Sequence, residues 1–60
     1  MNATEIFEHA RELFEVHGSA AIAEAAQKAA ALETQGDAEA AKDWRRIEAA
    51  LMQMRGPNET

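Results

Sequence analysis

Alanine makes up 15 of the 60 residues, and this composition constrains the fold more than any other feature of the chain. Alanine is the strongest helix former, because it loses no side-chain entropy and hides no polar group. It also contributes little apolar area. The large apolar side chains are few: Ile6, Phe7, Leu13, Phe14, Val16, Ile22, Leu32, Trp44, Ile47, Leu51, Met52 and Met54. The chain should therefore form helices readily and build only a thin core.

The length of the chain adds a second constraint. A domain of about 60 residues buries only about 60% of the surface that its unfolded chain exposes. Domains of this size usually gain stability from disulfides, a metal or a partner. The chain has no cysteine, which excludes a disulfide and a thiolate metal site. We therefore expect a homo-oligomer, most simply a homodimer, in which a second copy covers apolar surface.

The first predicted helix covers residues 3–17 and is amphipathic. Asn2 can cap it, and Glu5 three residues later completes a capping-box pattern. Its apolar face carries residues at helical spacing: Ile6, Phe7, Ala10, Leu13, Phe14 and His17. Its opposite face is charged and carries Glu5, Glu8, Arg11, Glu12 and Glu15.

The last predicted helix covers residues 38–54. Gly36 suits the left-handed position that ends the helix before it, and Asp37 suits the N-cap position. Its apolar residues alternate in steps of four and three, which is typical of helices packed at a shallow angle. These residues are Ala40, Trp44, Ile47, Leu51 and Met54.

Gly18 leaves two arrangements open for the middle of the chain. If Gly18 takes the left-handed position after the first helix and Ser19 caps the next one, a second helix covers residues 20–35. Alternatively, one long helix passes through Gly18, at a cost of about 1 kcal/mol relative to alanine. The cap chemistry favours the break.

Together these elements predict an all-α protein. The expected architecture is a small antiparallel helical hairpin or three-helix unit, completed by homo-oligomerisation. Strands are disfavoured, because β-branched residues are few and do not alternate. We expect one helical domain over residues 1–55 and a disordered C-terminal tail over residues 56–60, where Gly56 and Pro57 stop the last helix.

The segment GDAEAAKDWRRIEAAL, residues 36–51, resembles the turn and second helix of a tetratricopeptide repeat. The matching positions are the Gly-Asp turn, an alanine and the aromatic residue that follows it: Gly36, Asp37, Ala41 and Trp44. Glu48 stands where that family has alanine. The resemblance implies antiparallel packing of adjacent helices rather than peptide binding, because a single repeat does not build the concave groove of an array.

The whole chain also resembles a set of short uncharacterised helical proteins of alphaproteobacteria. The shared features are "HG", "GD", "WRRI" and "MRGP", found here at residues 17–18, 36–37, 44–47 and 54–57. This resemblance implies a small bacterial protein and no particular activity.

The charge and the apolar pattern of the chain limit the classes of partner and the cellular location that we expect. The net charge is −5, which repels phosphate backbones and disfavours nucleic-acid binding. No stretch approaches the roughly 18 consecutive apolar residues of a membrane span. Glu5 and Glu8 lie where a signal peptide would carry positive charge and an apolar run. We therefore expect a cytoplasmic protein that binds no membrane.

The sequence contains no pattern of an active site, a metal site or a cofactor site. Nucleophilic catalysis needs an activated side chain beside a base, and the only serine, Ser19, lies at a predicted cap. His9 lies near Glu5 and Glu12, but metal sites in helical bundles take such groups from more than one helix. We expect His9 to be a surface residue among salt-bridging groups, and His17 to end the first helix.

The last helix concentrates positive charge around a tryptophan. It holds four of the six basic residues: Lys42, Arg45, Arg46 and Arg55. One interpretation is a docking patch for an acidic or phosphorylated partner, anchored by Trp44. The other places Trp44 in the core and leaves the arginines solvated or paired with Asp43 and Glu48. The phase that Trp44 shares with Ile47 favours the core for Trp44.

We therefore expect a non-enzymatic helical interaction or structural protein that self-associates and docks a larger protein. The candidate interaction residues are Phe7, Phe14, Trp44, Arg45, Arg46, Ile47 and Leu51. Two alternatives stay open. One is a small inhibitor or regulator that binds a larger protein through acidic helix faces. The other is a dimeric helical-hairpin RNA-binding regulator, similar in architecture to the plasmid-copy-number RNA regulators.

Overall fold

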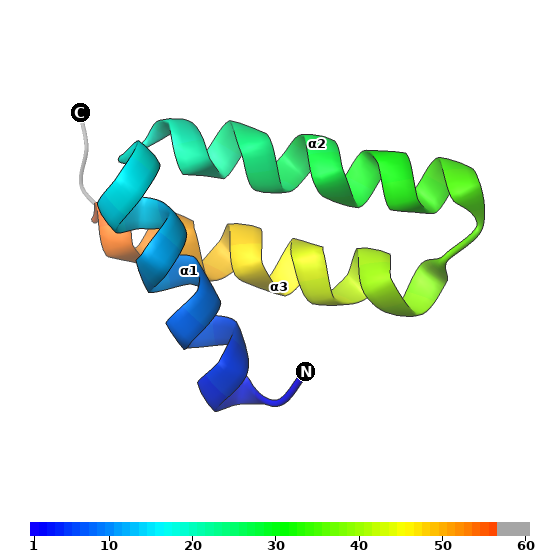
Figure 1. Cartoon of the computed structure of the whole chain (residues 1–60), viewed down its shortest axis with the longest axis horizontal. Coiled ribbons are helices and arrows are strands. Elements are labelled where there is room, and N and C mark those ends of the chain that lie inside the picture. Colours follow the sequence, from blue (N-terminus) through cyan, green and yellow to red (C-terminus); the bar gives the residue numbers. More distant parts are fainter. Residues whose placement is uncertain (57–60) are drawn as a thin grey trace.

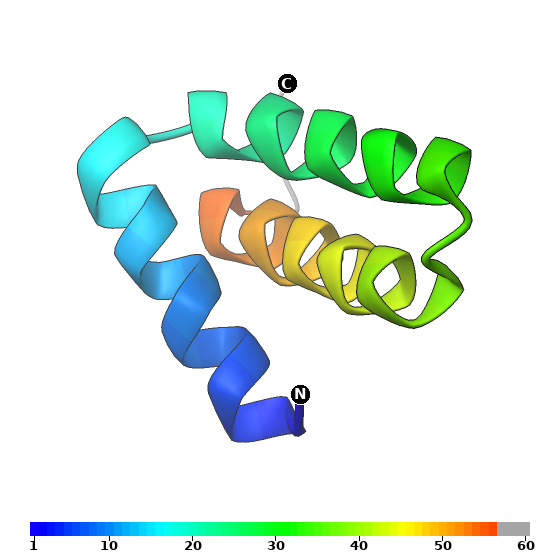
Figure 2. The same cartoon turned by 45° about the vertical axis from the view of Figure 1, so that its right-hand side comes forward.

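The computed structural model describes residues 1–56 and contains three helices, α1 (Ala3–His17), α2 (Ala20–Gln35) and α3 (Ala38–Arg55). Helices α2 and α3 form an antiparallel hairpin, and α1 lies obliquely across one end of it, mainly against α3 (Figure 1). The turned view shows α1 diverging from the plane of the hairpin (Figure 2). The predicted all-α three-helix unit is confirmed, and residues 1–56 contain no strand. The predicted tail, apart from Gly56, lies outside the described residues.

Local cap chemistry sets the starts of α1 and α3 as predicted. The Glu5 backbone N–H donates to Asn2 Oδ1 at 2.8 Å, and the Asn2 N–H donates to Glu5 Oε1 at 3.1 Å, which completes the capping box. The Ala40 N–H donates to Asp37 Oδ1 at 3.2 Å. Gly36, with φ 86° and ψ 11°, adopts the left-handed conformation that ends α2.

The helix is interrupted at Gly18, as the cap chemistry favoured, but the backbone conformation at Gly18 and the cap at Ser19 differ from those predicted. Gly18 has φ 61° and ψ −144°, so its φ is positive without the left-handed helical conformation that we predicted. The Ser19 side chain makes no capping hydrogen bond, because Ser19 already has helical dihedral angles. Instead, the N–H groups of Ala21 and Ile22 donate to the carbonyl oxygens of Gly18 and Ser19, at 3.0 and 3.1 Å. The backbone alone therefore starts α2.

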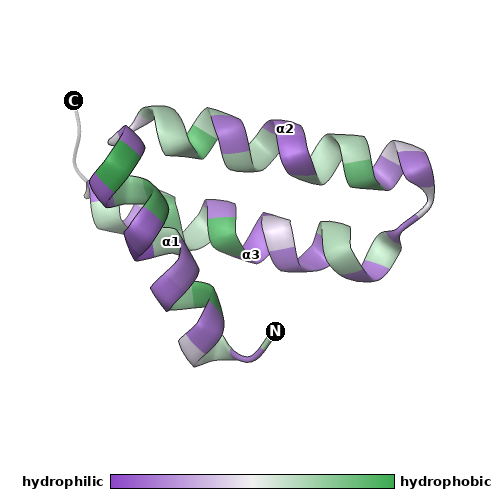
Figure 3. Ribbon diagram, viewed as in Figure 1, coloured by the Kyte–Doolittle hydropathy of each residue, from purple (hydrophilic) through white to green (hydrophobic). Residues whose placement is uncertain are grey.

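The face that α2 turns to its neighbours is made of alanine. Ala21, Ala25 and Ala29, four residues apart, have no exposed surface. Figure 3 shows α2 largely in the pale green of moderately hydrophobic residues, interrupted by hydrophilic ones. Because alanine projects so little, α2 can approach α3 closely. The core that results is thin, as the composition predicts.

The larger core residues are buried within a single copy of the chain. Ile47 and Leu51 of α3 have no exposed surface, and Ile6 of α1 is 5% exposed. The apolar residues of the first and last helices meet within one chain, because α1 folds over the hairpin end. A second copy is not needed to cover Ile47 and Leu51.

None of the helices within residues 1–56 combines the length and the apolar character that crossing a bilayer requires.

Candidate interaction surface

Phe7 is an aromatic side chain that α1 leaves half outside the core. Its exposed fraction is 49%, whereas that of the preceding residue, Ile6, is 5%. Consecutive residues of a helix point about 100° apart, so Phe7 lies at the edge of the side of α1 that faces the core. The other exposed large apolar residues of the described chain are Met1, Val16 and Met52.

A hollow of about 390 Å³, which we call the first hollow, lies beside Phe7 between α1 and α3. Buried Ile6 and Ala50 contribute to its lining, together with the small side chains of two further alanines, Ala3 and Ala49. Its complete lining is Met1, Asn2, Ala3, Ile6, Phe7, Arg46, Ala49, Ala50 and Gln53. The hollow exists because both helices present alanine where they diverge.

A second hollow of about 460 Å³ also has Phe7 in its wall. Its lining is Ala3, Thr4, Phe7, Glu8, Arg11 and Met54. Phe7 and Ala3 line both hollows. The second hollow differs from the first in carrying two charged side chains, Glu8 and Arg11.

Three charged residues beside Phe7 are exposed and have no ion pair within residues 1–56. Arg46 of α3 lines the first hollow, and Glu8 and Arg11 of α1 line the second. None of the three forms a salt bridge or a side-chain hydrogen bond with another described residue. The surface around Phe7 thus carries two unpaired cations and one unpaired anion.

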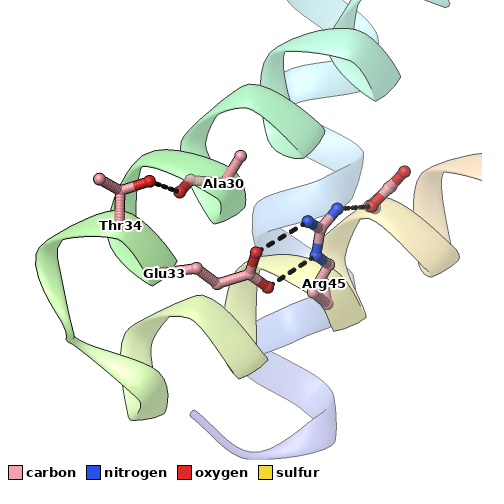
Figure 4. A network of polar contacts seen from close by, with 5 residues as sticks. Ala30, Glu33, Thr34 and Arg45 are labelled. Carbon is pink, nitrogen blue, oxygen red and sulfur yellow. Dashed lines mark hydrogen bonds and ion pairs between the residues drawn. The ribbon is translucent and has the colours of Figure 1, made fainter.

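Arg45, in contrast, forms hydrogen bonds and ion pairs within the chain. Its Nε and Nη2 donate to the two carboxylate oxygens of Glu33, each at 3.2 Å, and its Nη1 donates to Glu48 Oε1 at 3.2 Å (Figure 4). Hydrogen bonds from Arg45 lower the pKa of Glu33, and the hydrogen bonds to Glu33 and Glu48 raise the pKa of Arg45. Of the possibilities left open for the arginines, Arg45 thus pairs with Glu48, while Asp43 binds the Met1 amino group at 3.2 Å.

Trp44 lies at the edge of the core, where all three helices meet. It is half-buried and packs against the core cluster. The His9 ring of α1 packs against it in a T-shaped arrangement, and Lys28 Nζ of α2 lies 5.9 Å from the indole centroid. The prediction that Trp44 belongs to the core is confirmed in this partial sense.

The sequence predicted the position of His17 fully and the surroundings of His9 only in part. His9 is half-buried and lies among the glutamates of α1, as predicted, but one side of its ring also packs against Trp44, because the oblique path of α1 brings it to the indole. His17 ends α1, as predicted, and its Nδ1 lies 3.5 Å from Glu24 Oε2.

Of the seven predicted interaction residues, the structure leaves two, Phe7 and Arg46, exposed at the same hollow. Ile47 and Leu51 are buried within the chain, and Phe14 packs against the core. Nothing in the sequence pattern singles out the other residues that line the first hollow. Three of these seven residues are alanines, and the hollow depends on the angle at which α1 crosses α3.

Acidic side chains gather on the outer face of α1. A third hollow, of about 410 Å³, is lined by Met1, Glu5, Glu8, His9 and Glu12. Within the described part of the chain, however, no group of three or more histidine, aspartate or glutamate side chains is arranged to hold a metal ion.

Comparison with protein families, with curated proteins and with solved structures finds no match to this chain. Its function is therefore inferred from its own surface.

Proposed function

We propose that this chain is a non-enzymatic, cytoplasmic helical interaction protein that self-associates and docks a larger protein. The observation that carries the proposal is Phe7, 49% exposed beside the first hollow. Covering apolar surface contributes about 25 cal/mol per Å² to association. A large aromatic side chain next to a recess is also typical of the few residues that dominate binding energy.

The surface around Phe7 has the composition of a protein interface. Its lining combines apolar side chains, among them Phe7, Ala3 and Ala49, with the polar side chains of Arg46 and Gln53. Interfaces generally have an apolar centre and a polar rim. The lining of the first hollow pairs no nucleophile with a base, which supports binding rather than catalysis.

The size of the chain sets how much of it such an interface would occupy. A standard interface takes about 800 Å² from each partner, about a fifth of the 4083 Å² that this chain exposes. The Phe7 ring alone does not supply that area. The neighbouring faces of α1 and α3 must therefore take part.

Analytical ultracentrifugation of the pure protein tests self-association, over chain concentrations from about 1 μM to about 1 mM, which spans weak to moderate affinities. We expect the mean mass to rise with concentration. The thermal midpoint should rise with it, because a partner that binds only the folded chain stabilises it by mass action. A monomer throughout, with a midpoint independent of concentration, would contradict self-association.

The acidic face of α1 supports a second candidate, a regulator that binds a larger protein through charge. Glu8, Glu12 and Glu15 are all exposed on this helix. Salt weakens attraction between exposed charges, so binding to a basic partner should fall steeply as salt is raised. Binding that salt leaves unchanged would count against this candidate. The RNA-binding alternative stays a prediction that a gel shift with structured RNA at low salt tests.

A further inference from the structure

We propose that two copies of this chain associate about a twofold axis, with Phe7 of each copy seated in the first hollow of the other. This inference rests on the self-association proposed above and specifies its geometry. It depends on three features of the surface around Phe7: its shape, the apolar lining of the first hollow, and the placement of Arg46 and Glu8.

The shape of this surface is self-complementary. In a twofold dimer both copies use the same surface, so each feature needs its complement on that same surface. Phe7 is a half-exposed ring, and the first hollow lies directly beside it. A twofold axis passing between the ring and the hollow places each ring in the hollow of the other copy. The two rings then lie side by side at the axis, and both hollows are filled.

The lining of the two hollows decides which of them receives the ring. Buried Ile6 and Ala50 line the first hollow, with Ala3 and Ala49, so a ring that enters it displaces water from apolar surface. The second hollow carries two charged side chains, Glu8 and Arg11, whereas the first carries one, Arg46. Covering charged groups with an aromatic ring costs free energy, because they lose hydration without gaining a partner. The first hollow is therefore the better seat.

The charges beside Phe7 favour a second copy over an unrelated apolar segment. Arg46 lines the first hollow, and Glu8 follows Phe7 on α1. Neither has an ion-pair partner in the described chain. When Phe7 enters the hollow of the other copy, Glu8 on the same helix comes to the edge that carries the other copy's Arg46. Symmetry makes two such pairs, which orient the dimer more than they strengthen it.

Replacement of Phe7 by serine tests the ring, with dimerisation measured by sedimentation. We expect Phe7→Ser to raise the dimer dissociation constant about thirtyfold or more, the loss typical of a dominant interface residue. Val16→Ser is the matched control, because Val16 is 75% exposed on the same helix and lines none of the described hollows. Circular dichroism checks that both variants fold. A Phe7→Ser dimer as tight as the wild type would overturn the proposed geometry.

A second experiment fills the first hollow and leaves Phe7 unchanged. Ala49 is exposed and lines the first hollow, so Ala49→Trp should fill the space and block the incoming ring. Ala31→Trp places the same side chain at an exposed position of α2 outside the described hollows. Dimerisation should be lost in the first variant and kept in the second. Equal dimerisation of the two variants would count against the proposal.

A charge reversal tests the pair between copies. Arg46→Glu should weaken the dimer several-fold, and adding Glu8→Arg should restore it. The control is Arg46→Glu with Glu15→Arg, which has the same net charge but places the new arginine two turns further along α1. Equal restoration by the two double variants would overturn the Glu8–Arg46 pairing.

These outcomes separate the geometry from the self-association on which it rests. A wild-type chain that stays monomeric at every concentration would contradict self-association itself and therefore also this dimer. A helix of another protein would then be the remaining occupant of the first hollow. A wild-type dimer that is indifferent to Phe7, Ala49 and Arg46 would leave self-association standing and reject only the arrangement proposed here.

Discussion

The His9 imidazole and the Trp44 indole pack in a T-shaped arrangement, with ring centroids 5.1 Å apart and an interplanar angle of 62°. Lys28 adds its ammonium group 5.9 Å from the same indole. The three residues come from α1, α2 and α3, so Trp44 holds together helices that alanine packing alone would join weakly. Aromatic pairs in this arrangement add about 0.5–1.5 kcal/mol beyond the area they bury.

Trp44→Ala should destabilise the fold by about 2–4 kcal/mol, somewhat less than the range for a fully buried aromatic residue, because the indole is half-buried. His9→Ala should cost about 0.5–1.5 kcal/mol, the contribution of the ring pair. Urea unfolding followed by circular dichroism measures both. A loss below about 1 kcal/mol for Trp44→Ala would contradict its place at the junction of the three helices.

Asp37→Ala should destabilise the protein by about 1 kcal/mol, because it removes the hydrogen bond from the Ala40 N–H at the start of α3. Ser19→Ala is the matched control. Ser19 holds the equivalent position before α2 but makes no capping hydrogen bond, so the change should stay within about 0.5 kcal/mol. Equal losses in the two variants, measured by thermal unfolding, would argue against this difference between the caps.

Gly36→Ala should cost about 1–2 kcal/mol, because residue 36 has φ 86° and an L-residue is strained in that conformation. A Cβ there would meet no atom within 4 Å, so the penalty is one of backbone strain rather than of crowding. Gly36→Asn should recover part of the loss, since asparagine tolerates the left-handed region better. An alanine variant as stable as the wild type in urea unfolding would show that the turn can rearrange.

Ala25→Leu should destabilise the hairpin by about 1–3 kcal/mol, because Ala25 has no exposed surface and a larger side chain would push α2 away from the core. Ala31→Leu makes the same change at an exposed position of α2 and should be nearly neutral. Comparison of their thermal midpoints isolates the cost of crowding. A stabilised Ala25→Leu variant would mean that the core has room to spare.

Arg45→Met should raise the pKa of Glu33 toward its ordinary value of 4.5, because the hydrogen bonds from Arg45 hold it lower. A carboxyl group whose pKa is depressed by folding contributes stability above its unfolded pKa, and loses it as the pH falls through the folded value. The contribution of the Glu33–Arg45 pair should therefore be present at neutral pH and disappear below pH 4.5.

An NMR titration of the Glu33 side chain measures this shift. Arg46→Met removes a neighbouring charge that makes no hydrogen bond to Glu33, and should leave the pKa of Glu33 close to its wild-type value. If Glu33 titrates identically in the wild type and in Arg45→Met, the hydrogen bonds do not hold in solution.

Local chemistry made the helices predictable from the sequence. The capping box at Asn2, the Asp37 cap and the left-handed Gly36 each depend on neighbouring residues, and all three are present. Ser19 is the position at which this local prediction fails. A residue type suited to a cap does not cap when the backbone before it, here at Gly18, enters the helix by another route.

The positions of side chains around α1 could not be predicted in the same way. Phe7 and Phe14 are seven residues apart and share one face of α1, so the sequence pattern treats them alike. In the structure Phe14 packs against the core, whereas Phe7 stands beside a hollow lined by Ala49 and Ala50. The difference comes from the angle at which α1 crosses α3, a property of the whole fold. The approach of His9 to Trp44 has the same origin.

The alanine face of α2 has a consequence for the alignment of the hairpin. Because Ala21, Ala25 and Ala29 repeat every four residues, sliding α2 by about 6 Å along α3 would set alanine where alanine had been. Van der Waals packing alone therefore distinguishes neighbouring alignments only weakly. The short turn of Gly36 and Asp37 sets the observed alignment, and the guanidinium fork of Arg45 meets the Glu33 carboxylate in that alignment. A surface ion pair of small energetic value thus adds to the turn in favouring the observed hairpin over its neighbours.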